Sequence, residues 1–146
     1  MKKIFITGGA GFIGSHISEE IFKTFKKSKI IIFDKLTYAG NKKYIKSIIK
    51  SSRVKFVKGD IKNYNSYTKL LKNVDLAINV AAESHVDNSF TNPISFTLTN
   101  TVGAHTFILN CINNKVNVNV NDNDNNNVND NVNDNVNDNV NVPPGV

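Results

Sequence analysis

Apolar positions in the first 116 residues alternate between short continuous runs and longer stretches with helical spacing. The runs over residues 3–6, 29–34 and 74–82 are largely continuous and are typical of strands buried in a parallel sheet. Residues 53–58 alternate between polar and apolar positions, which predicts another strand. Residues 12–25, 44–49, 64–72 and 93–112 repeat apolar positions every three or four residues, which predicts helices. Strands that alternate with helices predict an α/β fold, with four parallel strands in the order 3-2-1-4 and flanking helices.

A glycine-rich turn joins the first predicted strand to the first helix. Gly8, Gly11 and Gly14 are three residues apart, which permits a tight turn and a close approach of the backbone to a pyrophosphate. Asp34 ends the second strand twenty residues after Gly14, the spacing of an acid that accepts the hydroxyls of an adenosine ribose. These features predict a partial Rossmann fold that binds NAD in preference to NADP, because a carboxylate repels a 2′-phosphate.

Ligands of such sheets bind where the strand order reverses, here between the first and fourth strands. The fourth strand leads to a polar run over residues 83–89, which is either a binding segment or a plain polar turn. Asp60 follows the third strand and is either an acceptor for the adenine amino group or a residue that caps its own loop.

Charge and composition limit the kinds of partner that the chain is expected to bind. The formal net charge is +6, but the lysines are scattered over helix faces without a nucleic-acid-binding motif, so no nucleic-acid partner is expected. The single cysteine, Cys111, excludes an internal disulfide and is expected to be buried. With no long apolar run and no signal peptide, we expect no membrane partner and a cytoplasmic localisation. No metal site is expected.

The end of the sequence has a different character. Only Asn, Val and Asp occur over residues 117–142, and a Val-Asn-Asp-Asn repeat runs through residues 128–139. Such a segment can bury little apolar area against the entropy of ordering it. The sequence therefore predicts a nucleotide-binding half-domain over residues 1–115 and a low-complexity, disordered tail over residues 116–146.

Residues 2–115 resemble the amino-terminal part of the dTDP-glucose 4,6-dehydratases, within the extended short-chain dehydrogenase/reductase superfamily. The superfamily resemblance rests on TGGAGFIGSH, which starts at Thr7, and on the run Asn100-Thr101-Val102-Gly103. The narrower resemblance rests on DKLTYAGN, which starts at Asp34, and on AAESHVDNS, which starts at Ala81. It implies that NAD is contacted by the following residues: Gly8, Gly11, Phe12, Ile13, Gly14, Asp34, Lys35, Leu36, Thr37, Asp60, Ile61, Val80, Ala81, Ala82, Glu83, Ser84 and Thr99.

The resemblance also implies a chemistry and a substrate. Ser84, His85 and Asp87 would face a nucleotide-sugar such as dTDP-glucose, which these NAD-dependent lyases oxidise at C4, dehydrate across C5 and C6, and reduce at C6. The family's base is the tyrosine of a Tyr-x-x-x-Lys pair, and a Thr-Asp-Glu run after the fifth strand serves the dehydration. Neither segment follows the fourth strand here, and all four tyrosines precede that strand, so we assign no catalytic residue.

The resulting interpretation is the NAD-binding portion of a nucleotide-sugar dehydratase, truncated or split and inactive alone. One alternative is a non-catalytic dinucleotide-binding fragment, such as a pseudogene product. Another is a different extended short-chain dehydrogenase, such as a nucleotide-sugar epimerase. A homodimer like that of the family also stays open.

Overall fold

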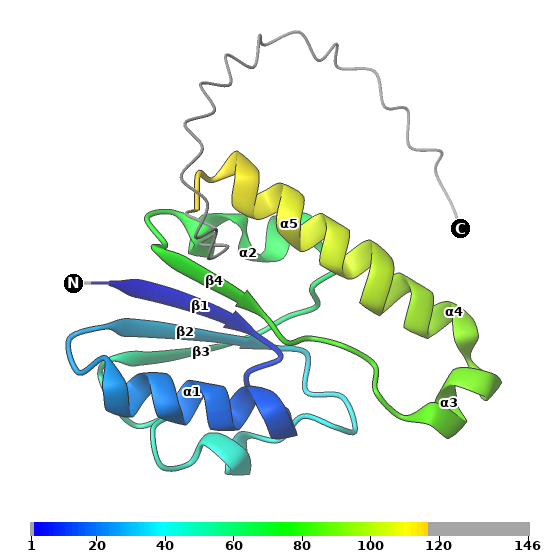
Figure 1. The fold of residues 1–146 in the computed structure, drawn as a ribbon, viewed down its shortest axis with the longest axis horizontal. Helices are drawn as coiled ribbons and strands as arrows, with labels where there is room; N and C mark the ends of the chain where they lie inside the picture. Colours follow the sequence, from blue (N-terminus) through cyan, green and yellow to red (C-terminus); the bar gives the residue numbers. More distant parts are fainter. Residues whose placement is uncertain (1, 117–146) are drawn as a thin grey trace, which may run out of the picture.

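The computed structural model describes residues 2–116, which form a parallel sheet between two layers of helices (Figure 1). The sheet has the order β3-β2-β1-β4, as the sequence predicts. The predicted disordered tail lies outside the described residues, except for Val116, which is buried in the core. The strands are β1 (Lys3–Thr7), β2 (Lys29–Asp34), β3 (Val54–Lys58) and β4 (Leu76–Asn79).

The two central strands are buried on both faces. Along β1, Ile4 and Ile6 contribute to the core on one side of the sheet, and Phe5 contributes to the core on the other. The same alternation continues on β2, which pairs with β1 in register from Lys3 opposite Lys29 to Thr7 opposite Phe33. Two apolar faces explain why these strands read as continuous hydrophobic runs in the sequence.

One helical layer consists of α1 (Phe12–Thr24) and the short 3₁₀ helix η1 (Lys42–Ile45), drawn below the sheet in Figure 1. The predicted helix over residues 44–49 was wrong in type and position. Asn41 caps η1 by accepting from the Lys43 amide at 2.9 Å, and turns follow Ile45. A segment this short gains little from helical bonds, so the burial of Ile45 and Ile48 decides its conformation.

The other layer consists of α2 (Tyr64–Leu71) and α5 (Ala104–Asn113). Phe5 and Phe33 of the sheet meet Tyr67 of α2 and Phe107 of α5 here, with ring centroids 5.2 to 6.2 Å apart. Cys111 is buried in the same cluster, as predicted, and burial raises the pKa of its thiol to about 11.

Between β4 and α5 the chain forms α3 (Val86–Thr91), α4 (Pro93–Phe96) and the π-helical segment η2 (Thr97–Gly103). The sequence predicts a polar loop over residues 83–89 and one regular helix over 93–112, so both predictions needed correction. Asn92 separates the pieces, because its side chain accepts from the Ser95 amide at 3.3 Å and Pro93 takes the first helical position.

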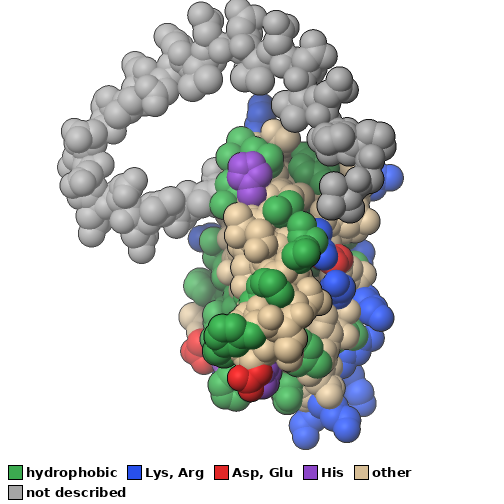
Figure 2. Space-filling model, turned by 90° about the vertical axis from the view of Figure 1, so that its right-hand side faces the viewer, with side chains coloured by type: hydrophobic (Ala, Val, Ile, Leu, Met, Phe, Trp, Pro, Cys, Tyr) green, Lys and Arg blue, Asp and Glu red, His purple; other side chains and the backbone are tan. Residues whose placement is uncertain are grey.

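Helical spacing overstated how much of two helices is buried. Phe12 of α1 is 73% exposed, and Ile108 and Ile112 of α5 are 53% and 59% exposed. Figure 2 shows the side of the molecule that carries α3 and α4. Hydrophobic side chains lie among polar ones on this face, and lysine and arginine side chains gather along one flank. Periodicity marks which residues share a helix face, whereas the packing of the sheet decides which face is covered. None of the helices within residues 2–116 is long and apolar enough to cross a membrane.

Candidate nucleotide site

The glycine-rich turn leaves no room for side chains at two of its glycines. Gly8 has a φ of +65°, and a Cβ there would lie 2.6 Å from the Ala81 backbone nitrogen. A Cβ on Gly14 would lie 2.1 Å from the Gly8 carbonyl oxygen. The first glycine therefore brings β1 against the exit of β4, and the last lets α1 start directly on the turn.

The start of α1 offers unpaired amides at the surface of the turn. The first helical hydrogen bond there is donated by the Ser15 amide to the Gly11 carbonyl oxygen at 2.9 Å. Gly11, the N-cap residue, has no side chain to satisfy the amides of Phe12, Ile13 and Gly14, and the first turn holds no acidic residue. These amides and the positive end of the helix dipole favour an anion at this place.

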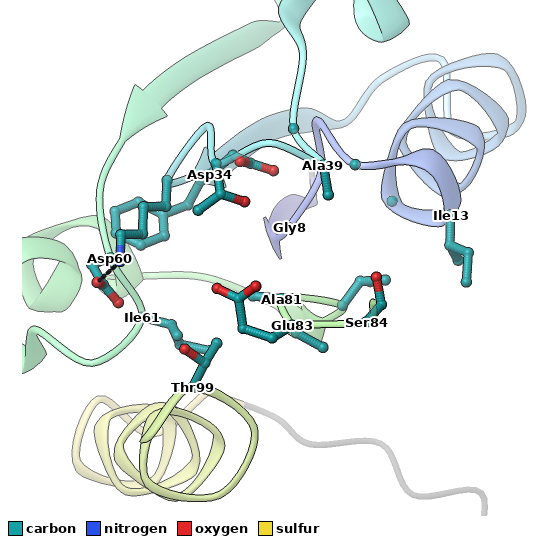
Figure 3. Close-up of a pocket in the computed structure, with 18 of the residues that line it drawn as sticks. Gly8, Ile13, Asp34, Ala39, Asp60, Ile61, Ala81, Glu83, Ser84 and Thr99 are labelled. Carbon is teal, nitrogen blue, oxygen red and sulfur yellow. Dashed lines mark ion pairs between the residues drawn. The ribbon is translucent and has the colours of Figure 1, made fainter. Parts of the chain in front are cut away.

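A cavity of about 330 Å³ opens beside the turn, at the carboxyl ends of the strands (Figure 3). This volume falls in the range of small-molecule sites, which is roughly 300–1,000 Å³. In Figure 3 the labelled side chains of Asp34, Glu83 and Thr99 border the same open space. Its lining contains Gly8, Gly11, Phe12, Ile13, Gly14, Asp34, Lys35, Thr37, Asp60, Ile61, Val80, Ala81, Ala82, Glu83, Ser84 and Thr99, together with Phe33, Ala39, Gly40 and Gly59, which are absent from the predicted NAD contacts.

The structure separates three of the sequence-predicted residues from this lining. Leu36, in a left-handed conformation with a φ of 56°, packs against the isoleucine cluster on the α1 side of the sheet. His85 and Asp87 belong to the start of α3, where the His85 ring meets the edge of Tyr38 with centroids 5.7 Å apart. Only Ser84 of the predicted sugar-facing residues lines the cavity.

Asp34 is held rigidly at the end of β2. Its carboxylate is buried and accepts two backbone amides, from Ala10 at 2.9 Å and from Leu36 at 2.7 Å. The first bond ties it to the glycine-rich turn, 24 residues earlier in the chain. Because a carboxylate has about four acceptor positions, Asp34 retains capacity for hydroxyl donors in the cavity.

Asp60 follows β3, the strand next to that of Asp34, and its carboxylate has a lysine on each of two sides. Its carboxylate pairs with the Lys35 ammonium at 2.8 Å and lies 3.8 Å from that of Lys62, while it accepts from the Lys62 amide at 3.0 Å. Burial alone would raise the pKa of Asp60, but the bonds from Lys35 and Lys62 and their two positive charges lower it. The hydrogen bond from the Lys62 amide agrees with the loop-capping alternative. Asp60 also lines the cavity, so its contact with the adenine amino group stays a prediction.

The segment that leaves β4 is fixed from two directions. Thr7 of β1 accepts from the amides of Val80 and Ala81 at 3.2 and 3.4 Å, which ends the strand earlier than the predicted 74–82. Asn100 of η2 accepts from the Glu83 amide at 2.8 Å and donates to the Glu83 carbonyl at 2.9 Å. Asn100 is absent from the predicted site residues, although its run with Gly103 was recognised. This positioning role is revealed only by its two hydrogen bonds to the Glu83 backbone.

One Tyr-x-x-x-Lys match does occur in the sequence, Tyr38 to Lys42, but it lies before the fourth strand. The structure does not pair these residues. Tyr38 lies in a non-helical loop with its ring against His85, whereas the Lys42 ammonium lies 4.6 Å from the ring centroid of Phe56 on β3. On a helix the spacing would place both side chains on one face, but this loop has no such periodicity.

Comparison with known proteins agrees with this geometry. The family model of GDP-mannose 4,6 dehydratase matches residues 5–126. The chain belongs to this family. A relative, the dTDP-D-glucose 4,6-dehydratase of Dictyostelium discoideum, is 44% identical over 121 residues, which cover 79% of this chain and 27% of that protein. The sequence-based resemblance is thereby confirmed, and the chain spans about a quarter to a third of the curated dTDP-glucose dehydratases it matches.

Solved structures of similar proteins share the fold. A dTDP-glucose 4,6-dehydratase of Streptomyces venezuelae with NAD bound has a TM-score of 0.75 and 36% identity, over 78% of this chain and 37% of that one. A UDP-Glc/GlcNAc 4-epimerase of Campylobacter jejuni has a TM-score of 0.71 and 31% identity, over 80% of this chain and 35% of that one. The two activities named for these structures correspond to the predicted dehydratase and its epimerase alternative.

Proposed function

We propose that residues 2–116 bind NAD and form the nucleotide half of a 4,6-dehydratase site that acts on a nucleotide-sugar of the dTDP-glucose type. The observation that carries the proposal is the glycine-rich turn closed against a buried carboxylate, since Asp34 accepts the Ala10 amide of that turn. The two elements recognise different parts of one ligand, a pyrophosphate and a ribose, and they border the same cavity.

Each part of the dinucleotide has a matching group in the cavity. The free amides of the first turn of α1 would hold the pyrophosphate, and Asp34 would accept the ribose hydroxyls. Asp60 and Ile61, at the end of β3, would contact the adenine. NAD would supply the hydride acceptor for sugar oxidation. Glu83 and Ser84, positioned by Asn100, would border the reacting end, and we propose Ser84 as the sugar contact nearest the cofactor.

A dehydratase origin is favoured over an epimerase origin by the relatives. The matched proteins from Dictyostelium discoideum, Salmonella typhimurium and Homo sapiens are dTDP-glucose 4,6-dehydratases at 36% to 44% identity. The UDP-Glc/GlcNAc 4-epimerase structure is more distant, at 31%. The run from Asp34 to Asn41, which shapes one wall of the cavity, carries the same preference.

Calorimetric titration of the 146-residue chain should show tighter binding of NAD than of NADP. We expect Asp34→Ala to weaken NAD binding by about ten- to a hundredfold, because a hydrogen bond to a charged group contributes about 1.5–3 kcal/mol. The ratio of NADP affinity to NAD affinity should rise in this variant, since the repulsion of a 2′-phosphate is removed.

Asp75→Ala is the matched control for Asp34→Ala. Asp75 also accepts a backbone amide, that of Lys3 at 2.6 Å, but it does so before β4, at the other end of the sheet. It should change stability without changing the ratio of the two affinities. Equal binding of NAD and NADP by the unaltered chain would remove Asp34 from the proposed role.

The clamp on Glu83 gives a separate prediction. Asn100→Ala removes two hydrogen bonds, and we expect it to lower the free energy of unfolding by about 1–2 kcal/mol. NAD affinity should fall severalfold, because the segment from Ala81 to Ser84 must then be ordered on binding. Thermal unfolding and calorimetry of this variant, beside Asn113→Ala, which removes a bond to Tyr64 remote from the cavity, measure the two effects. An unchanged affinity would show that the segment holds its position without Asn100.

A further inference from the structure

Among residues 2–116, Lys35 is the one cationic residue in the lining of the cavity, next to the acid proposed to bind the ribose. It directly follows Asp34, and a basic residue near the ribose site accommodates the 2′-phosphate of NADP in folds of this kind. The sequence therefore suggests that Lys35 softens the preference for NAD. Its ammonium, however, lies 2.8 Å from the Asp60 carboxylate.

The architecture of the sheet holds this pair together. Asp34 of β2 lies opposite Lys58 of β3, and the Gly59 amide donates to the Asp34 carbonyl at 3.0 Å. Asp60, the next residue, is thereby brought beside Lys35 across two adjacent strand ends. Within residues 2–116 both recorded ion pairs end on Asp60, the second from Lys62 at 3.8 Å.

We propose that Asp60 is a specificity-determining residue that disfavours NADP by holding the Lys35 ammonium away from the 2′-phosphate position. This inference rests on the proposed NAD site and deepens it, because it adds a second device to the repulsion from Asp34. Any contact between Asp60 and adenine would be shared by both dinucleotides, whereas the restraint on Lys35 acts on NADP alone.

The expected effect is modest because the pair is partly open to solvent. The Lys35 side chain is 51% exposed and that of Asp60 is 26% exposed. The coupling energies that double-mutant cycles measure for exposed ion pairs correspond to factors of about two to five in an equilibrium constant. Release of Lys35 should therefore raise the NADP-to-NAD affinity ratio by about two- to fivefold.

The test uses calorimetry of the full 146-residue chain with NAD and with NADP. Asp60→Asn removes the ion pair and keeps a side-chain oxygen for the Lys62 amide, so the loop retains its turn. We expect this variant to raise the NADP-to-NAD ratio, and Lys35→Met on the Asp60→Asn background to abolish the gain. Lys35→Met alone should change the ratio little, since the Lys35 ammonium is already paired with the Asp60 carboxylate in the unaltered chain.

Two controls separate Lys35 from other charge effects. Glu83→Gln removes another acidic charge of the cavity that is in no recorded ion pair within residues 2–116. Lys62→Met on the Asp60→Asn background removes the other lysine beside Asp60 and should leave the gain intact.

The outcomes distinguish this inference from the proposed function. An Asp60→Asn ratio equal to that of the unaltered chain overturns the inference, as does a raised ratio that survives Lys35→Met or is matched by Glu83→Gln. All three results leave NAD binding in place. Failure of the folded, unaltered chain to bind either dinucleotide overturns the proposed function, and this inference falls with it.

Discussion

Conversion of dTDP-glucose by the purified 146-residue chain is expected to lie at least about 10⁴-fold below that of a complete dTDP-glucose 4,6-dehydratase. Residues 2–116 hold the groups that we propose to position a cofactor, but none of these described residues is placed to take the proton of the C4 hydroxyl as a hydride leaves. General acid–base catalysis contributes typically about 10²–10⁴-fold per group, and both oxidation and elimination require it.

The tyrosines of the chain illustrate the deficiency. Tyr67 donates to the Ile61 carbonyl at 3.0 Å, and burial raises its pKa to about 12, the opposite of what a catalytic base needs. Tyr64 accepts from the Asn113 side chain at 2.9 Å, away from the cavity. Tyr38 lies near the cavity but is separated from Lys42, whose ammonium rests over Phe56. Within residues 2–116, none of these three tyrosines is paired with a lysine.

A product assay for the 4-keto-6-deoxy sugar measures this deficiency, with a complete bacterial dTDP-glucose 4,6-dehydratase as the positive control. Tyr38→Phe is the informative variant, because Tyr38 lies between the cavity-lining residues Thr37 and Ala39, and the change removes its hydroxyl while keeping the ring that meets His85. Turnover by the unaltered chain would overturn the prediction. Its loss in Tyr38→Phe would then identify an unexpected base.

Gly14→Ala is expected to lower the free energy of unfolding by about 3 kcal/mol and the melting temperature by about 10 °C or more. The added Cβ would lie 2.1 Å from the Gly8 carbonyl oxygen and 2.9 Å from the Gly9 Cα, so the clash is with backbone that cannot rotate away. To relieve it, α1 must move off the turn. NAD binding should be lost with that movement.

Gly11→Ala is the matched control within the same turn. Its Cβ would meet only the Gly8 carbonyl, at 3.3 Å, and Gly11 has an ordinary extended φ of −79°. Stability should therefore change by less than about 1 kcal/mol, a typical limit for substitutions without a specific clash. Thermal unfolding followed by circular dichroism compares the two variants. Equal melting temperatures for Gly14→Ala and Gly11→Ala would contradict the close approach at Gly14.

The strands and the turn could be predicted because their signals are local. A strand buried on both faces reads as a continuous apolar run, and β1 and β2 are buried in this way. Alternating elements then leave few arrangements of a parallel sheet, and the order with β1 beside β4 followed. The glycines announce the turn because a positive φ, as at Gly8, suits few other residues.

The helices were less well predicted because their burial depends on partners elsewhere in the chain. Phe12 and Ile112 fit the helical period, yet they lie on faces that no element within residues 2–116 covers. The segment from Val86 to Gly103 divides into three helical pieces, whereas its composition suggests a loop followed by one helix. Caps such as Asn92 decide such divisions, and a cap has the composition of a loop.

The sequence by itself determined the order of the elements, the glycine-rich turn and the acid at the end of β2, since each depends on neighbours along the chain. The tertiary structure alone decided which distant side chains meet at the strand ends. It placed Lys35 against Asp60, joined Asn100 to Glu83, and separated Tyr38 from Lys42 despite their spacing. These contacts depend on strand register and loop direction, which bring residues together without leaving a periodic trace in the sequence.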